Sequence, residues 1–221
     1  MNFSPVFTIR VIDLAGTVGD STITFYGAQM YSGVTWACYG AYSWSFPLLI
    51  SNTLGNTVST YCMLTYLTVV RREEKVKGKH STNTYTRSLI TALFFVMLSL
   101  THLVVTIFLI MNNKTNFAKM MTGYESSIAS IVMLSSPLMM FKRIIETKNA
   151  QSLAPLTIFF AFFNTLFWVI AGFMIKDIFI IFPNLVCFIA CCCQYILLFR
   201  YGRGGSAKTI IHQAIASVPF D

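Results

Sequence analysis

Apolar residues dominate six stretches of the chain, and short polar or charged segments separate them. Each stretch is long enough, at about 20 residues, to cross the roughly 30 Å hydrocarbon layer of a bilayer as a helix. The stretches run over residues 21–41, 46–69, 88–111, 121–141, 155–175 and 178–199. A seventh apolar stretch, residues 3–12, is too short to cross. The pattern therefore predicts an all-α integral membrane protein.

Two turns between apolar stretches share one residue pattern, WACYGAYSWSFPLLISN at 36–52 and WVIAGFMIKDIFIIFPN at 168–184. In each, a tryptophan precedes an asparagine by sixteen residues and a glycine by four. A shift of 132 residues also places Ser4-Pro5 on Ser136-Pro137 without a gap. An internal repeat takes precedence over local motifs in predicting a fold. In a membrane protein, a parallel repeat points to a transporter with its site between the halves.

The repeat predicts four segments. Residues 1–72 form a first three-helix repeat, 73–120 hold a cytosolic loop, a linker helix and an outer loop, 121–201 form the second repeat, and 202–221 form a tail. The linker helix has no partner in the repeat and restores the orientation of the second half. The first helix is expected to be incomplete, because only three residues precede Ser4, whereas about fifteen residues of the fifth helix precede Ser136.

Charged residues make up only 11% of the chain, while 55% of it is hydrophobic. When the predicted loops are assigned alternately to the two sides, thirteen of the sixteen basic residues fall on one side. The positive-inside rule makes that side cytosolic, together with the C-terminal tail. The net charge of +8 is therefore a topology signal, and no nucleic-acid partner is expected. The run RREEKVKGKH, residues 71–80, is interpreted as a solvated cytosolic loop without a site.

The acidic residues all fall in predicted loops or at helix ends, and Glu125 is assigned to an outer helix end. Carriers coupled to protons or sodium commonly keep a carboxylate at depth in the membrane. This distribution favours uncoupled movement of a solute. No nucleophile, base or metal-ligand set converges in the pattern, so neither enzymatic activity nor a metal or cofactor is expected.

Tryptophan and asparagine lie at depth instead. Trp36 and Asn52 each lie about seven residues from the outer turn, roughly 10 Å below the outer surface at 1.5 Å per residue, and Trp168 and Asn184 do the same. An amide suits adjacent hydroxyls, and an indole face suits the apolar face of a sugar ring. The alternative is that they are interhelical contacts and interface anchors. One helical turn before the two tryptophans, on the same helix faces, lie Ser32 and Asn164.

The chain resembles the SWEET sugar transporters, most specifically in its second half. The motifs there are Ser136-Pro137-Leu138, Thr147-Lys148 with Ser152, Asn164 through Trp168 to Gly172, and Pro183-Asn184 with Gln194 and Tyr201. The first half carries the same pattern more weakly. Its matching residues are Ser4-Pro5, Trp36, Tyr39-Gly40, Asn52 and Gly55.

This resemblance implies a seven-helix fold of two parallel three-helix bundles joined by a linker helix, with the first helix incomplete here. It implies movement of mono- or disaccharides by alternating access. The implied sugar-binding residues are Trp36, Asn52, Trp168, Asn184, Ser32 and Asn164, with Ser130 and Met133 from the fifth helix. The implied hinge prolines near the cytosolic side are Pro5, Pro137 and Pro155, while the fourth proline position falls on or next to Ile23.

We therefore expect a bidirectional, uncoupled sugar uniporter of the plasma membrane with a cytosolic C-terminus. Its expected partners are a small sugar and membrane lipid, and a homo-oligomer is compatible with the pattern. Two alternatives stay open. A PQ-loop-type carrier of another small solute predicts an acidic or cationic group in the pocket. A membrane assembly protein without transport is compatible with an incomplete first helix.

Overall fold

A computed structural model of the chain describes residues 4–19, 21–78, 84–133, 135–150, 153 and 155–202. Within these residues every regular element is a helix, as the apolar pattern predicts. The described helices are α1 (Ser4–Ala15), α2 (Ile23–Tyr42), α3 (Phe46–Lys77), α4 (Tyr85–Met111), α5 (Thr115–Met133), α6 (Ser135–Thr147), α7 (Pro155–Ile175) and α8 (Ile178–Tyr201). Apart from Gly202, the predicted tail over 202–221 lies outside the described residues.

Three described helices are long and apolar enough to cross a membrane by themselves, namely α4, α7 over residues 158–175, and α8. The helices α2, α3 and α5 lie where crossing helices are predicted, but serine, threonine, asparagine and tyrosine side chains make them less apolar. Because polar groups inside a membrane require partners or a water-filled path, this difference is consistent with a polar lining. The crossing of these three helices stays a prediction.

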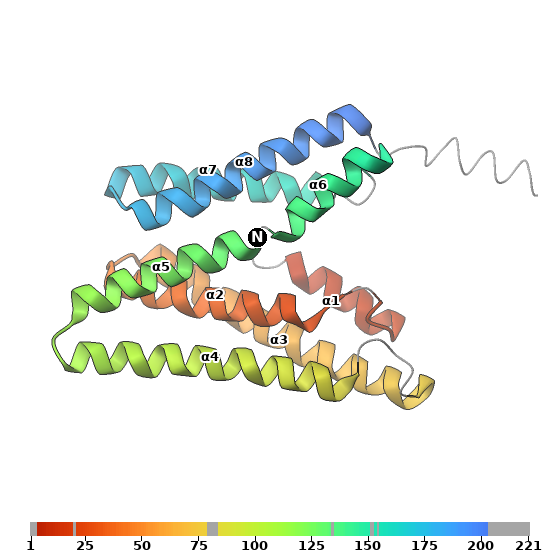
Figure 1. The fold of residues 1–221 in the computed structure, drawn as a ribbon, viewed down its shortest axis with the longest axis horizontal. Coiled ribbons are helices and arrows are strands. Elements are labelled where there is room, and N and C mark those ends of the chain that lie inside the picture. Colours follow the sequence, from red (N-terminus) through yellow and green to blue (C-terminus); the bar gives the residue numbers. More distant parts are fainter. Residues whose placement is uncertain are drawn as a thin grey trace, which may run out of the picture. The chain divides into compact units, whose positions relative to one another are not determined.

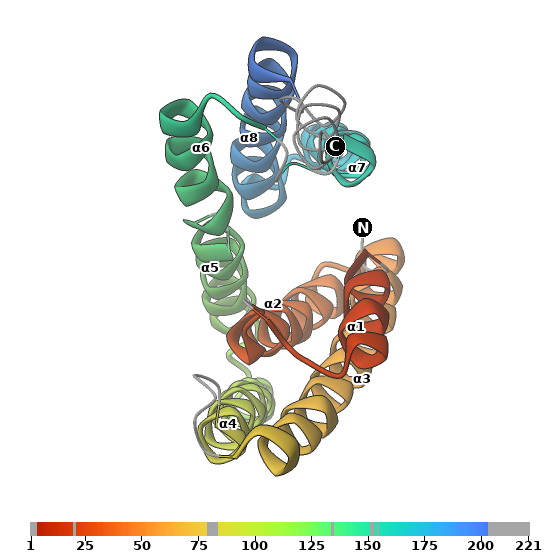
Figure 2. The ribbon, with the colours of Figure 1, turned by 90° about the vertical axis from the view of Figure 1, so that its right-hand side faces the viewer.

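The chain divides into two units, Met1–Met133 and Leu134–Asp221. In unit 1, α2 packs against α3, α4 and α5, and α1 packs against α3 (Figures 1 and 2). One buried cluster joins four helices, with members such as Ile9 in α1, Met30 in α2, Tyr66 in α3 and Ala92 in α4. This packing gives α2, which carries Ser32 and Trp36, a central place in unit 1.

In unit 2, α7 packs along α8 and α6 packs against α8 (Figure 1). A buried cluster contains Ile144 of α6, Ile158 of α7 and Cys191 of α8. Aromatic rings extend this contact, because Phe162 and Phe188 have ring centroids 4.8 Å apart. Helix α8 thus contacts both α6 and α7 through apolar side chains.

Both units contain three helices in the same order, namely a short helix, a long helix and a third helix that contacts both. These are α1, α2 and α3 in unit 1, and α6, α7 and α8 in unit 2. The 132-residue shift maps Ile23, which begins α2, on Pro155, which begins α7. It also maps Phe46, which begins α3, on Ile178, which begins α8, and Ala15 on Thr147 at the ends of α1 and α6. The repeat seen in the sequence is therefore present in the helix boundaries.

Two predicted boundaries are wrong. The helix α3 continues to Lys77, so residues 71–77 are helical and not a loop, because glutamate, lysine and arginine are good helix formers. Glu73 there is only 7% exposed and accepts hydrogen bonds from the Thr17 hydroxyl (2.7 Å) and the Val18 N–H (3.0 Å). The predicted span 121–141 is described as two helices, and α5 begins six residues before it, at Thr115.

Candidate functional site

The α2–α3 hairpin of unit 1 and the α7–α8 hairpin of unit 2 have the same turn. The Ser45 N–H donates to the Gly40 carbonyl at 2.9 Å, and the equivalent Asp177 N–H donates to the Gly172 carbonyl at 3.0 Å. At each tip one residue adopts a left-handed conformation, Trp44 with φ 53° and its equivalent Lys176 with φ 56°. Identical turns fix the register of each hairpin, so equivalent positions on the flanking helices keep equivalent surroundings.

Glycine allows the two helices of each hairpin to approach closely. A Cβ atom at Gly40 would lie 2.7 Å from the backbone nitrogen of Leu49. At Gly172 the nearest atom would be Cγ1 of Ile181 at 2.8 Å, with the Ile181 nitrogen at 3.1 Å. The contact at Gly40 is too close for a real Cβ atom, and the contact at Gly172 would require the Ile181 side chain to move. The two glycines therefore allow the close packing of α2 on α3 and of α7 on α8.

The two predicted site asparagines make the same hydrogen bond. Asn52 Nδ2 donates to the carbonyl oxygen of Leu48 at 2.8 Å, and Asn184 Nδ2 donates to that of Ile180 at 2.8 Å. Both bonds stay within one helix, so they do not join neighbouring helices as the alternative interpretation requires. Each bond uses one of the two amide protons, and the amide oxygen has two lone pairs. The half-buried amides can therefore bind a polar ligand without losing this bond.

In unit 1 the structure brings Trp36 and Ser130 together. The indole Nε1 of Trp36 donates to the Ser130 hydroxyl oxygen at 2.9 Å, and that hydroxyl donates to the Ser126 carbonyl at 2.9 Å. Ser32, one turn before Trp36, is also buried, and Met133 ends α5 half-buried. The bond to Ser130 orients the indole ring, which leaves its face as the surface for an apolar contact.

In unit 2, Trp168 and Asn164 are half-buried on α7, and Asn184 is half-buried on α8. Within the part of unit 2 that the structure describes, Trp168 makes no hydrogen bond like that of Trp36 to Ser130. Pro183 lies inside α8, directly before Asn184, and removes one backbone hydrogen bond from the helix at that point. Of the predicted hinge prolines, Pro5 is buried in α1, Pro137 lies in α6, and Pro155 begins α7.

Asn56 of α3 is a polar residue that the sequence analysis missed. Oriented to satisfy both neighbours, its amide donates to the Met30 carbonyl (2.9 Å) and accepts from the Val34 N–H (3.1 Å). These two backbone groups normally pair with each other in an α-helix, so the Asn56 amide bonds to the acceptor and the donor of one backbone pair of α2. A Cβ atom at Gly33 would lie 2.2 Å from a terminal atom of the Asn56 amide group, so Gly33 makes room for the amide. Glycine opposite asparagine is the signal that could have found this contact.

A buried ionisable group was also missed. His102 Nδ1 of α4 lies 2.5 Å from Glu125 Oε2 of α5, and the Tyr31 hydroxyl of α2 donates to the same oxygen at 3.3 Å. The assignment of Glu125 to an outer helix end is wrong, because α5 begins at Thr115, ten residues earlier. A carboxylate therefore does lie inside unit 1, paired with a histidine.

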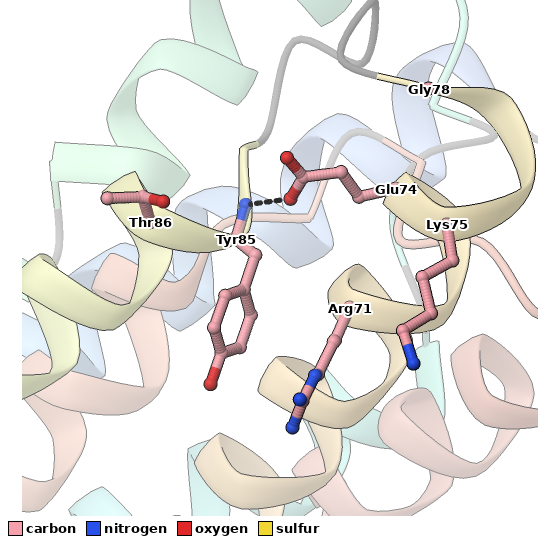
Figure 3. A pocket seen from close by; sticks show the side chains of 6 residues that line it. All are labelled: Arg71, Glu74, Lys75, Gly78, Tyr85 and Thr86. Carbon is pink, nitrogen blue, oxygen red and sulfur yellow. Dashed lines mark hydrogen bonds between the residues drawn. The ribbon is translucent and has the colours of Figure 1, made fainter.

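A shallow pocket lies at the other end of unit 1, where α3 ends and α4 begins. Its lining residues are Arg71, Glu74, Lys75, Gly78, Tyr85 and Thr86 (Figure 3). The Glu74 carboxylate accepts a hydrogen bond from the Tyr85 N–H at 2.8 Å, and the Arg71 guanidinium carbon lies 5.7 Å from the centre of the Tyr85 ring. These contacts join α3 to the start of α4, so we interpret the pocket as part of a helix junction.

Comparison with known proteins gives a consistent result. Residues 120–204 match a family described as "Sugar efflux transporter for intercellular exchange". The bidirectional sugar transporter SWEET3 of Arabidopsis thaliana is 34% identical over 83 residues, a match that spans 38% of this chain and only about a third (32%) of that relative. The sugar transporter SWEET1 of Dictyostelium discoideum is 24% identical over 202 residues, which cover 89% of this chain and 85% of the relative.

A solved structure of a eukaryotic SWEET transporter has the same fold. It superposes with a TM-score of 0.77 at 17% sequence identity, over 90% of this chain and 89% of that one. The all-α fold expected from the sequence is therefore confirmed. The identity is too low for this likeness to say more than the fold.

Proposed function

Because the chain belongs to the SWEET family of sugar transporters, which are not enzymes, we propose that it is a bidirectional uniporter that moves mono- or disaccharides down their gradient by alternating access. The family and the apolar helices make it an integral membrane protein. Its location in the plasma membrane and its cytosolic C-terminus are parts of the proposal. Besides the sugar, its proposed partners are membrane lipid and a second copy of the chain in a homo-oligomer.

The observation that carries the proposal is the pair Asn52 and Asn184, which make the same bond at positions 132 residues apart. Each amide keeps one donor and its oxygen for adjacent hydroxyl groups. Trp36 and Trp168 supply ring faces for the apolar side of a sugar. The remaining proposed sugar-binding residues are Ser32, Asn164, Ser130 and Met133.

Alternating access requires helices that bend or tilt. Pro5, Pro137 and Pro155 are the proposed hinge residues. Each lies in the first turn of its helix, α1, α6 or α7, where the helix can change direction relative to the segment before it. At the fourth position the chain has Ile23, the first residue of α2. About two to three turns further along α2, the Asn56 amide bonds to the Met30 carbonyl and the Val34 N–H, and we propose that α2 bends there instead.

Because Glu125 lies inside unit 1, the proposal of uncoupled movement rests on the partners that the carboxylates have and no longer on their depth. Glu73 and Glu74 hold helix ends on the predicted cytosolic side through hydrogen bonds. Glu125, the acidic residue inside unit 1, already has a histidine partner. In the described part of the chain, the proposed sugar-binding residues are neutral, so a coupling ion has no carboxylate among them.

The test is uptake and release of labelled hexose by cells that lack their own hexose carriers and express this chain. We expect the internal sugar concentration to reach the external concentration and stop there, and preloaded cells to lose sugar at a similar rate. An inwardly directed proton gradient should leave that final concentration unchanged. Accumulation above the external concentration under a proton gradient would contradict uniport, and the absence of any flux in correctly inserted protein would contradict transport.

A further inference from the structure

We propose that His102 and Glu125 form a proton-binding site inside unit 1, and that proton binding there sets the rate of transport without driving it. The effect on transport rests on the proposed function, whereas proton binding itself does not. The ligand is a single exchangeable proton, shared between an imidazole and a carboxylate.

The geometry places both groups well inside the helices. His102 lies nine residues before the end of α4, and Glu125 lies ten residues after the start of α5. At 1.5 Å per residue both are about 14 Å from the turn that joins the two helices. The His102 side chain is only 2% exposed, while that of Glu125 is 35% exposed. Glu125 therefore provides the route by which a proton reaches the buried imidazole.

The hydrogen bonds leave one nitrogen of the imidazole unsatisfied. Nδ1 is 2.5 Å from Glu125 Oε2, but Nε2 is buried with no hydrogen-bond partner among the described residues. A histidine kept only for structure would normally have both ring nitrogens bonded, because an unpaired buried polar atom is costly. Ionisable residues at membrane depth that bear such a cost are candidates for function.

Charge explains why a proton binds here. With one proton bound, imidazolium and carboxylate form a pair without net charge, whereas loss of that proton leaves a single negative charge in a poorly polar setting. Histidine is the side chain that ordinarily changes charge between pH 5 and 8. Two other titratable groups face the pair from α2, namely Tyr31, whose hydroxyl donates to Glu125, and Cys38, which is close enough to Glu125 to interact with its charge.

The site connects the linker helix to the helices that carry proposed sugar contacts. His102 is on α4, Glu125 is on α5 with Ser130, and Tyr31 is on α2 with Trp36. The protonated pair holds these three helices together by a charge-assisted hydrogen bond, and its deprotonation weakens that contact. Protonation therefore restrains helix motion, and transport slows as the pH falls.

The transport test uses purified protein in lipid vesicles, with equal pH on both sides so that no proton gradient exists. We expect hexose exchange to rise at least about threefold from pH 5.5 to pH 8 in the unmodified protein, and to vary by less than that in His102→Gln and Glu125→Gln. The controls are His80→Gln and His212→Gln, the other two histidines of the chain, which should keep the profile. A flat profile in the unmodified protein, or an unchanged profile in both site variants, would overturn the proposal.

A second measurement tests proton binding without transport. In a His80→Gln/His212→Gln background, nitrogen NMR of ¹⁵N-histidine in lipid nanodiscs observes His102 alone. We expect the chemical shifts of both ring nitrogens to change together between pH 5 and pH 9, because Nδ1 lies against the Glu125 carboxylate that shares the proton. A His102 signal that is constant from pH 5 to 9 would refute the site even if sugar transport is normal. Titration with no sugar flux at any pH would retain the site and refute the proposed function.

Discussion

The hairpins α2–α3 and α7–α8 have the same turn and the same asparagine bond, but their interiors differ. In the first, Asn56 bonds to the backbone of α2 next to Gly33. The equivalent positions in the second are Phe188, which packs on Phe162, and Thr165, which bonds to its own helix. The two hairpins thus match at the turn and at the proposed tryptophan and asparagine contacts, and they differ where the two helices pack. The comparison separates residues kept for a ligand from residues that determine local rigidity.

The largest expected effect is on the shared asparagines. Asn52→Ala and Asn184→Ala should each lower hexose uptake about a hundredfold, corresponding to two lost hydrogen bonds of about 1–1.5 kcal/mol each. Uptake by cells with equal surface expression is the measurement. The matched control is Asn112→Ala, because Asn112 bonds to the Phe108 carbonyl in the same way but is exposed at the end of α4. A large loss in one site variant and none in the other would break the equivalence of the hairpins.

The close helix contacts should respond unequally. Gly40→Ala forces a methyl group against the Leu49 backbone and should cost about 2–3 kcal/mol of stability, whereas Gly172→Ala first meets the movable Ile181 side chain and should cost about 1 kcal/mol. The quantity to compare is the melting temperature of each variant in detergent, measured by size-exclusion chromatography after heating. Equal melting temperatures would show that the hairpins tolerate the added methyl equally.

The contact between Asn56 and Gly33, which is specific to the first hairpin, should show energetic coupling between these two residues. Asn56→Ala should cost about 1–2 kcal/mol, because the amide satisfies two backbone groups of α2. Gly33→Ala displaces the same amide, so the double variant should be little worse than the worse single variant. The readout is again the melting temperature. Additive losses would mean that Gly33 and Asn56 act separately.

The smallest expected effect is at Ser130. Ser130→Ala removes the acceptor of the Trp36 indole N–H and should weaken sugar binding roughly fivefold, for about 1 kcal/mol. Apparent affinity for hexose uptake is the quantity to compare. Ser127→Ala, on the same helix α5, is the control and should leave the affinity within about twofold. No change with Ser130→Ala would mean that orientation of Trp36 does not limit binding.

Sequence patterns predicted the parts of the fold that depend on local spacing. The interval from Trp36 to Asn52, repeated after 132 residues, contains the turn, the glycine at the helix contact and the asparagine. Both hairpins could therefore be located from the sequence alone. Apolar stretches marked the helices but not their ends. Helix α3 continues through charged residues, because helix propensity does not end where the apolar stretch ends.

Long-range pairs could not be predicted in the same way. Glu125 looked like a helix-end residue because the polar stretch over 112–120 resembled a loop, although most of it begins α5. His102 and Glu125 are 23 residues apart and pair only when α4 and α5 fold back on each other. Asn56 and Gly33 likewise meet only when α2 packs on α3. Such contacts depend on which helix faces meet, which one sequence does not determine.

The most direct test of the central claim, that the tryptophans of both hairpins contact sugar, uses these two tryptophans as fluorescence reporters. Trp44 is 84% exposed at the hairpin tip, so Trp44→Phe leaves only Trp36 and Trp168 to emit. Adding Trp168→Phe or Trp36→Phe then isolates each one. The proposal predicts that hexose changes the emission of both single-tryptophan proteins with the same apparent Kd. A change in only one of them, or in neither, would contradict the proposal that both repeats contribute sugar contacts.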